Sequence, residues 1–211
     1  MNILIAIPSM DTVPAVFTQS LAMLQKVGNC AVAFQVGSLV YDSRNKLGKK
    51  AIEMDSDMVL WLDSDMVFEP NLLVDMVKTL EDNALDMLTG IYYRRKEPYT
   101  PVIFDKTEIL ESTGCITTEF ETIPDGLFEV GSCGFGCVLM KTQVMFDVMA
   151  RYRDLFGPIG RVGEDISFCW RARQCGYRIF ADPSIKLGHY SQQIVTRQFY
   201  EAFKGAKNGT N

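Results

Sequence analysis

Apolar residues in the first half of the chain fall into short, nearly continuous runs. Such runs occur at residues 3–7, 31–36, 58–62 and 87–93. Runs of this length bounded by Pro, Gly or Asp are typical of strands that are buried on both faces. Between them, apolar residues recur at helical spacing over residues 15–27, in the segment that Ser43 would cap, and over residues 70–80. The alternation of strand and helix predicts a largely parallel sheet with helices on its faces.

The alternation is less regular after residue 94. Short strands are expected at 99–104 and 117–120, and a glycine-rich stretch at 127–140 ends in a further strand. Helical spacing returns at 142–152 and 164–174, followed by a strand at 178–181 and a turn at Asp182-Pro183-Ser184. We therefore predict an α/β fold: a single domain over residues 1–211, with a Rossmann-like, mostly parallel central sheet flanked by helices and a smaller, mixed second half.

Composition and charge argue against several classes of protein. The 211 residues are 47% hydrophobic and 22% charged, as in an ordinary globular domain. The formal net charge of −5 and the lack of a long basic run argue against binding to a nucleic-acid backbone. No stretch reaches the roughly 18 consecutive apolar residues of a transmembrane segment, and the first residues lack a basic leader, so we expect a cytoplasmic protein. The six cysteines form no Cys-x-x-Cys pair and are expected to be reduced and mostly buried.

The tetrapeptide Asp-Ser-Asp-Met occurs twice, at opposite ends of one predicted strand. Ligands of open α/β sheets bind beyond the carboxyl ends of the strands. Asp63-Ser64-Asp65, which follows the strand, is therefore placed for chemistry, whereas Asp55 and Asp57 precede it and belong to a solvated turn. Two carboxylates at i and i+2 offer hard oxygen ligands to Mg²⁺ or Mn²⁺. Alone this spacing is a weak signal, because Asp-x-Asp pairs in loops are more often capping or solvated.

A second acidic pair opens the helix predicted at residues 164–174. Glu164 and Asp165 fall in its first turn, where the helix dipole favours negative charge. That preference alone can explain why two acidic residues occur at a helix start, without any catalytic role. A carboxylate held there can also act as general base toward an acceptor hydroxyl. His189 is the only histidine. Imidazole is a frequent ligand of Mn²⁺, although a lone histidine is more often structural.

In order and approximate spacing, these motifs resemble those of GT-A glycosyltransferases, particularly family 2-like enzymes. The resembling pieces cover most of the chain and are residues 3–9 as the first strand and nucleotide loop, Ser43-Arg44-Asn45 at a helix start, Asp63-Ser64-Asp65 as the DXD motif, Gly134-Phe135-Gly136 before an apolar strand, Glu164-Asp165 as the xED motif, and His189 as the C-terminal metal ligand. The resemblance implies a domain whose residues 1–95 bind the nucleotide and whose residues 96–211 bind the acceptor and carry catalysis.

The resemblance also implies a role for each candidate residue. Nucleotide contacts are expected from Pro8, Ser9, Arg44, Asp63 and Ser64, metal contacts from Asp63, Asp65 and His189, and sugar or acceptor contacts from Gly134, Gly136 and Trp170. The cofactor would be Mn²⁺ or Mg²⁺ on the diphosphate of a UDP- or GDP-sugar. Asp165, beside Glu164, would take the proton of the acceptor hydroxyl as its oxygen attacks the anomeric carbon, while the cation stabilises the departing nucleoside diphosphate. Displacement in a single step would invert the anomeric configuration.

Several alternatives remain compatible with the sequence. Arg44 is also explained as a helix-surface residue among three lysines, and glycines before a strand are often simple loop formers. A sugar-phosphate nucleotidyltransferase is another alternative. Enzymes of that class usually carry a glycine-rich, basic loop directly after the first strand, and Pro8-Ser9-Met10-Asp11 has neither feature. A nucleotide- or glycan-binding module with a degenerate site is the non-enzymatic alternative.

Two further features bear on the acceptor side. The chain contains no Gln-x-x-Arg-Trp motif, which favours a non-processive enzyme, but the sequence does not identify the acceptor. The amphipathic segment at residues 192–203 is expected to pack on the core, or alternatively on a partner subunit or a membrane surface.

Overall fold

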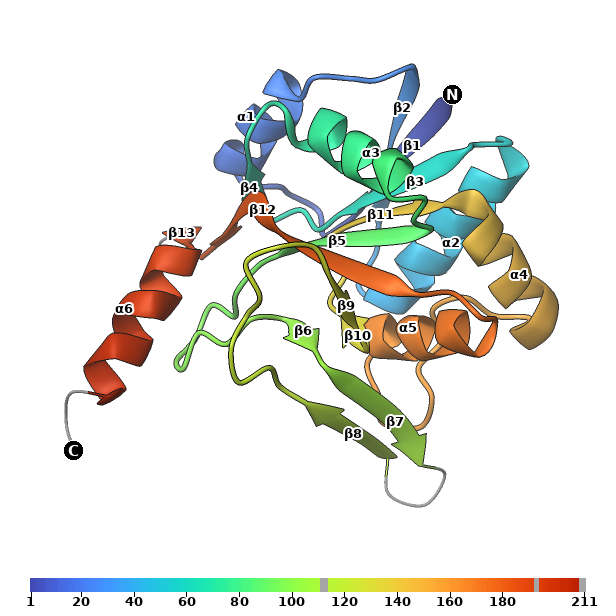
Figure 1. Cartoon of the computed structure of the whole chain (residues 1–211). Helices are drawn as coiled ribbons and strands as arrows, with labels where there is room; N and C mark the ends of the chain where they lie inside the picture. The colour runs from blue at the N-terminus through green and yellow to red at the C-terminus, as the bar shows by residue number, and fades with distance from the viewer. Residues whose placement is uncertain (111–113, 192–193, 209–211) are drawn as a thin grey trace.

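A nine-stranded sheet runs through the part of the chain that the computed structural model describes, residues 1–110, 114–191 and 194–208 (Figure 1). Its strands are β1 (Asn2–Ser9), β2 (Asn29–Val36), β3 (Met58–Leu62), β4 (Met66–Phe68), β5 (Met87–Ile91), β9 (Phe128–Val130), β11 (Cys137–Lys141), β12 (Ile179–Tyr190) and β13 (Ile194–Val195). Two smaller pairings are β6 (Ile103–Phe104) with β10 (Ser132–Cys133) and β7 (Lys106–Leu110) with β8 (Gly114–Thr118). The helices are α1 (Ala15–Met23), α2 (Val40–Glu53), α3 (Leu72–Asp82), α4 (Thr142–Tyr152), α5 (Glu164–Gln174) and α6 (Arg197–Asn208).

Five strands of the large sheet run in the same direction. Along the order β13-β12-β5-β11-β3-β1-β2, β1 is parallel to both of its neighbours, and β5 is parallel to β12. β11 is antiparallel to both β3 and β5, so β5 runs the same way as β3. The carboxyl ends of β1, β3 and β5 therefore open on one edge of the sheet, where ligands bind in such folds. The predicted α/β class, with a mostly parallel central sheet flanked by helices, is confirmed.

Alternate side chains of β3 enter two separate apolar layers. Val59 and Trp61 belong to the layer that includes residues of α2, α4 and α5, whereas Met58, Leu60 and Leu62 belong to the layer that includes residues of α1 and α3. All five side chains are buried. Burial on both faces explains why this strand is a continuous apolar run in the sequence. Figure 1 accordingly shows α1 and α3 on one side of the sheet and α2, α4 and α5 on the other.

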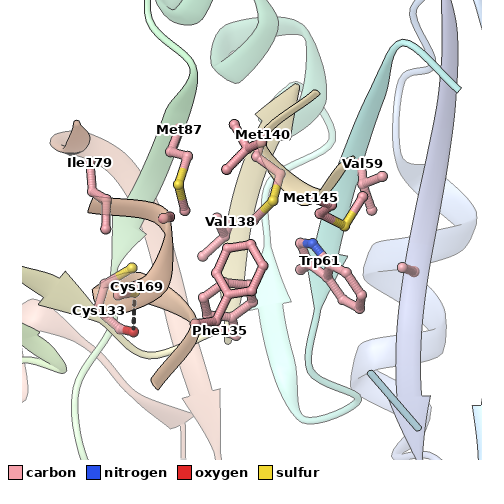
Figure 2. Close-up of a cluster of buried hydrophobic side chains, with 14 of the residues drawn as sticks. Val59, Trp61, Met87, Cys133, Phe135, Val138, Met140, Met145, Cys169 and Ile179 are labelled. Atoms are coloured by element: carbon pink, nitrogen blue, oxygen red, sulfur yellow. Dashed lines mark hydrogen bonds between the residues drawn. The ribbon is translucent and has the colours of Figure 1, made fainter. Parts of the chain in front are cut away.

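An aromatic cluster supports the carboxyl end of β3 from the side of α2, α4 and α5. The Trp61 ring centroid lies 5.0 Å from that of Phe156 and 6.0 Å from that of Phe135, both in edge-on orientation. Figure 2 shows Trp61 and Phe135 in this layer, where the Cys169 thiol also donates a hydrogen bond to the Cys133 carbonyl oxygen. Because these rings are fully buried and packed edge to face, the backbone on either side of Phe135 is held firmly behind the site described below.

β12 is longer than the sequence predicts. The strand expected at 178–181 continues to Tyr190, and the predicted turn at Asp182-Pro183-Ser184 is instead an irregularity within it, where the register with β5 shifts between Asp182 and Lys186. The Asp182 carboxylate accepts hydrogen bonds from the backbone N–H and the hydroxyl of Ser184, which satisfies polar groups at the irregularity. The continued strand pairs with β4 and brings His189 opposite Met66, just after the Asp63–Asp65 loop.

Two helices differ from their predicted boundaries because tertiary hydrogen bonds compete with the helix. The helix predicted over 15–27 ends at Met23, and the N–H of Gln25 bonds to the carbonyl oxygen of Pro70 at 2.7 Å. The prediction that Ser43 caps α2 is wrong. The helix begins at Val40, the Ser43 N–H donates to Leu39, and the Ser43 side chain is buried.

Several other strands also differ from their predicted boundaries. The strand predicted at 87–93 ends at Ile91, the one at 99–104 is reduced to β6, and the one at 117–120 is replaced by β8. The sequence did not predict β4 or β13, whose apolar runs are only three and two residues long, or β7, which is largely exposed.

α6 packs against the segment that follows β5. The Tyr200 ring stacks on that of Tyr93 at 5.0 Å, and the Phe199 ring lies 5.7 Å from that of Tyr99. These contacts agree with the expectation that the amphipathic segment at 192–203 packs on the core, although Gln192 and Gln193 lie outside the described residues. A role of this segment in contacting a partner stays a prediction.

The six cysteines, all within the described ranges, are free, and three of them are fully buried. No described helix is both long enough and apolar enough to cross a membrane.

Candidate active site

A cavity of about 180 Å³ opens at the carboxyl ends of β1 and β3. Its lining comprises Pro8, Ser9, Met10, Gly37, Ser38, Val40, Ser43, Asp63, Ser64 and Asp65. Four of the five residues predicted to contact a nucleotide therefore share one cavity. A larger cavity, of about 680 Å³, lies between β12 and α6 and contains none of the predicted site residues.

Arg44, the fifth residue predicted to contact a nucleotide, does not line this cavity. It forms an ion pair with Asp63, which does. Its Nη2 is 2.8 Å from Asp63 Oδ1, and its Nε is 3.4 Å from Glu164 Oε1. Nη1 donates to the carbonyl oxygen of Phe135 at 3.4 Å, and the guanidinium lies over the Phe135 ring. Only 3% of the Arg44 side chain is exposed, so the alternative of a helix-surface arginine is wrong. The Arg44 guanidinium therefore joins the loop after β3 to the start of α5.

The two carboxylates on Arg44 lie in an environment that disfavours their charge. Burial raises the pKa of Asp63 to about 6, Arg44 opposes this shift, and the charges of Asp65, Asp165 and Glu164 add to it. Burial likewise raises the pKa of Glu164, with Arg44 again opposing and Asp165 contributing. Several negative charges therefore converge on one partly buried site, an arrangement that a bound cation relieves.

Asp65 faces a histidine and an arginine. Its Oδ2 lies 3.4 Å from His189 Nε2 and 3.0 Å from Arg95 Nη1, and its carbonyl oxygen accepts the N–H of Tyr190 at 2.8 Å. Burial alone would raise the pKa of Asp65. The hydrogen bond and charge of His189, together with the charge of Arg95, outweigh that effect and lower the pKa. Asp65 is therefore ionised at neutral pH.

The orientation of His189 fits a metal ligand. His189 Nδ1 is 2.8 Å from the carbonyl oxygen of Tyr93, which can only accept, so Nδ1 carries the proton. Nε2 then faces the Asp65 carboxylate, and a cation that takes the place of a proton between them would be shared by the Nε2 lone pair and the carboxylate. A nitrogen–oxygen ligand pair suits Mn²⁺, with Mg²⁺ preferring oxygen alone.

The third predicted metal ligand is engaged elsewhere. Asp63 is paired with Arg44 rather than with Asp65 and His189. In the described ranges, no group of three or more His, Cys, Asp or Glu side chains is arranged to hold a metal ion. Of the three predicted ligands, only Asp65 and His189 therefore face each other, and the other positions on a cation would be left to substrate oxygens and water.

Asp165 and Tyr92 belong to the same electrostatic environment. Asp165 Oδ1 accepts the N–H of Ile166 at 2.8 Å in the first turn of α5. Burial raises the pKa of the Tyr92 hydroxyl well above its usual range, and the charges of Asp63 and Asp165 add to the shift. No sequence motif singles out Tyr92, although it directly follows the buried strand β5.

Gly134 and Gly136 make room for the Tyr92 ring. A Cβ at Gly134 would lie 2.0 Å from the Tyr92 hydroxyl oxygen, and one at Gly136 would lie 2.8 Å from the Tyr92 ring. The Tyr92 ring in turn meets that of His189 edge-on, with centroids 5.3 Å apart. The glycines therefore allow an aromatic side chain to pack behind His189. Their predicted contact with a sugar or acceptor stays a prediction.

Trp170 lies apart from these residues. It is partly exposed on α5, and its ring centroid is 6.1 Å from that of Tyr152 at the end of α4. Arg95, by contrast, was not predicted. The signal was available in Tyr92-Tyr93-Arg94-Arg95, a basic pair directly after a buried strand whose carboxyl end shares the edge with Asp63.

The second copy of the acidic tetrapeptide has a structural role. Asp57 Oδ2 accepts the N–H of Asn2 and lies 3.8 Å from the N-terminal amino group, at the opposite end of β3 from Asp63. Asp55 and Asp57 are exposed, as predicted for a turn that enters the strand.

The sheet order, the helices on both faces and the acidic loop after β3 define a GT-A-like fold, and solved structures share it. A crystal structure of A197 from STIV matches with a TM-score of 0.66 and 20% identity, covering 93% of this chain and 94% of that chain. No protein-family model and no curated protein matches the sequence.

Two glycosyltransferase structures also match. The crystal structure of GalNAc-T7 with UDP, GalNAc and Mn²⁺ has a TM-score of 0.61 and 10% identity, covering 97% of this chain and 47% of that chain. The crystal structure of S. aureus TarS 1–349 has a TM-score of 0.53 and 16% identity, covering 86% of this chain and 58% of that chain. Identities this low establish the fold alone, so activity has to be argued from the site.

Proposed function

We propose that this chain is a metal-dependent glycosyltransferase that moves a sugar from a UDP- or GDP-sugar to an acceptor hydroxyl. The proposal rests on the joining of two acidic motifs by one arginine, since Arg44 contacts both Asp63 after β3 and Glu164 at the start of α5. Neither motif is specific alone. Their convergence beside a cavity at the carboxyl edge of the sheet is what the proposed chemistry requires.

The nucleotide is proposed to enter the cavity lined by Pro8, Ser9 and Ser64. A volume of about 180 Å³ is small for a whole nucleotide-sugar, because pockets for ligands of that size usually exceed roughly 300 Å³. The enclosed part would be the nucleoside, with the diphosphate on the side of Asp65. The fold shared with GalNAc-T7, crystallised with UDP, GalNAc and Mn²⁺, makes a UDP-sugar the first donor to test.

Asp65 and His189 would hold the cation together with oxygens of the diphosphate. When bound, a divalent cation neutralises the charge that develops on a leaving nucleoside diphosphate. The chain prepares this site by bonding the Asp65 carbonyl to Tyr190 and His189 Nδ1 to Tyr93. These contacts fix the backbone of Asp65 and the orientation of the imidazole.

Asp165 is the proposed general base. It would take the proton of the acceptor hydroxyl as that oxygen forms its bond to the anomeric carbon and the bond from that carbon to the diphosphate oxygen breaks. This single displacement inverts the anomeric configuration. Glu164, held by Arg44, would fix the start of α5 and thereby the position of Asp165. Residues 96–211, including Gly134, Gly136 and Trp170, are proposed to form the acceptor side.

Donor hydrolysis gives a direct test without knowledge of the acceptor. The protein would be incubated with a panel of UDP- and GDP-sugars with Mn²⁺, with Mg²⁺ or with a chelator, and release of nucleoside diphosphate would be measured. We expect slow, metal-dependent release from at least one donor. If no donor binds or is hydrolysed under any condition, the proposed activity is wrong.

A further inference from the structure

Asp65 has a second partner that the proposed function does not use. Arg95 Nη1 lies 3.0 Å from Asp65 Oδ2, the same oxygen that faces His189 Nε2 at 3.4 Å. A guanidinium thus carries positive charge at the carboxylate oxygen that the proposed function assigns to a cation.

The loop that carries Arg95 is closed on itself and exposed. The N–H of Arg94 donates to Thr100 at 3.0 Å, the N–H of Tyr99 donates to Lys96 at 2.9 Å, and a β-bridge joins Tyr93 to Pro101. The backbone is therefore anchored at its base, while 49% of the Arg95 side chain is exposed. An exposed arginine on an anchored loop can exchange one anionic partner for another without disturbing the core.

The same segment also orients the histidine, since the carbonyl oxygen of Tyr93 contacts His189 Nδ1. His189 and Arg95 are therefore positioned against Asp65 by backbone only two residues apart. Arg44, in contrast, is only 3% exposed and holds two carboxylates. Of the two arginines, only Arg95 is free to move toward a ligand.

Resting on the proposed function, we propose that Arg95 is a positioning residue that pairs with Asp65 in the metal-free protein and transfers its ion pair to the nucleoside diphosphate when the cation binds. The guanidinium competes with the cation for Asp65. It then finds a new anionic partner only when the diphosphate is present, because guanidinium groups pair readily with phosphate oxygens. Cation and nucleoside diphosphate should therefore bind with positive coupling, and Arg95 should contribute to it.

The test measures Mn²⁺ binding itself rather than turnover. Free Mn²⁺ would be followed by electron paramagnetic resonance in titrations of chelator-treated protein, alone and with saturating UDP or, in parallel, GDP. The variants are Arg95→Ala, Arg95→Lys and, as a control, Lys96→Ala, which removes the same charge from an exposed position in the same loop. The control separates the contact with Asp65 from the general field of the loop, which salt screens.

We expect Arg95→Ala to bind Mn²⁺ alone about 2- to 5-fold more tightly, the range that a solvent-exposed ion pair can supply. The factor by which the nucleotide tightens Mn²⁺ binding should fall by a similar amount. Arg95→Lys retains the positive charge and should therefore show smaller changes of both kinds. Lys96→Ala should resemble the wild type. Under the proposal, Mn²⁺ affinity in the presence of nucleotide therefore stays nearly unchanged in Arg95→Ala. A role of Arg95 in general loop structure would instead weaken Mn²⁺ binding both with and without nucleotide.

The failures of the inference and of the proposed function are distinguishable. If the wild type binds Mn²⁺ and its affinity for Mn²⁺ is raised by UDP or GDP, but Arg95→Ala matches it in both titrations, the inference is wrong and the proposed function stands. If Arg95→Ala binds Mn²⁺ more weakly than the wild type, the inference is also wrong. If the wild type binds no Mn²⁺ with or without nucleotide, both are overturned.

Discussion

Arg44 and Asp63 form an ion pair at 2.8 Å that ties the first turns of α2 to the end of β3, with the arginine almost fully buried. The same guanidinium reaches Glu164 on α5. The Arg44 guanidinium thus connects three elements that are distant in sequence. The structure of the site therefore depends on Arg44, whatever the substrate is.

Replacing Arg44 with Ala should destabilise the metal-free protein by about 3 kcal/mol, because two partly buried carboxylates lose their cation. The free energy of unfolding would be measured by urea denaturation. Arg178→Ala is the control, since Arg178 pairs with Glu129 at 2.8 Å on the surface and its loss should cost less than about 1 kcal/mol. Equal effects of the two substitutions would contradict the importance assigned to the buried cation.

The central sheet was predictable because its strands are buried on both faces. β1, β3 and β11 are continuous apolar runs, and the regular alternation of strands with helices α2 and α3 indicated a parallel arrangement. The position of β11 between β3 and β5, and its reversed direction, were not predictable, since the apolar pattern of a buried strand is independent of direction. The length of β12 was hidden by its irregularity at Asp182.

The acidic and histidine residues were predictable by type, but their pairings were not. Strand polarity was sufficient to choose Asp63 over Asp55. The separation of Asp63, which pairs with Arg44, from Asp65, which faces His189, depends on which way each side chain leaves the loop. Tyr92 and Arg95 contact His189 and Asp65 from the segment after β5, which β11 separates from β3 in the sheet, and the order of strands in a sheet cannot be predicted from local sequence.

Asp165→Asn should reduce transfer or donor hydrolysis by about 10²- to 10⁴-fold, the range associated with loss of a general base. Binding of Mn²⁺ and of nucleoside diphosphate should be retained, since Asp165 is assigned to neither ligand. Turnover and nucleotide affinity would be measured on the same preparation. Asp55→Asn is a matched control, because it removes the same charge from an exposed position before β3, away from the candidate site, and Asn tolerates the positive φ of 51° found there. Unchanged turnover in Asp165→Asn would exclude it as the base.

Gly134→Ala should destabilise the protein by about 1–3 kcal/mol, because its Cβ would lie 2.0 Å from the Tyr92 hydroxyl oxygen in a buried, close-packed region. The double variant with Tyr92→Phe should recover part of this loss, since the nearest clashing atom is gone. Val102 would remain 2.7 Å away, so recovery should be incomplete. Gly126→Ala, with no atom within 4 Å, is the control and should be nearly neutral. Urea denaturation of these three variants, the Tyr92→Phe single variant and the wild type provides the comparison, and strictly additive effects would contradict the contact.

The two copies of the acidic tetrapeptide allow the metal assignment to be tested within one chain. Asp65→Asn and Asp57→Asn make the same chemical change at equivalent positions of each copy, at opposite ends of β3. Asp65 faces His189, whereas Asp57 binds the N–H of Asn2, a bond that the amide oxygen of Asn can also accept.

Mn²⁺ affinity in the presence of nucleoside diphosphate should therefore fall more than about tenfold for Asp65→Asn, since even residues that only support metal ligands typically contribute 10- to 100-fold. It should be nearly unchanged for Asp57→Asn. His189→Ala should reproduce the loss of Asp65→Asn, and a combined loss no greater than either single one would show that carboxylate and imidazole act on the same ion. If Asp57→Asn weakens Mn²⁺ binding as much as Asp65→Asn does, strand polarity is the wrong criterion for choosing between the two copies.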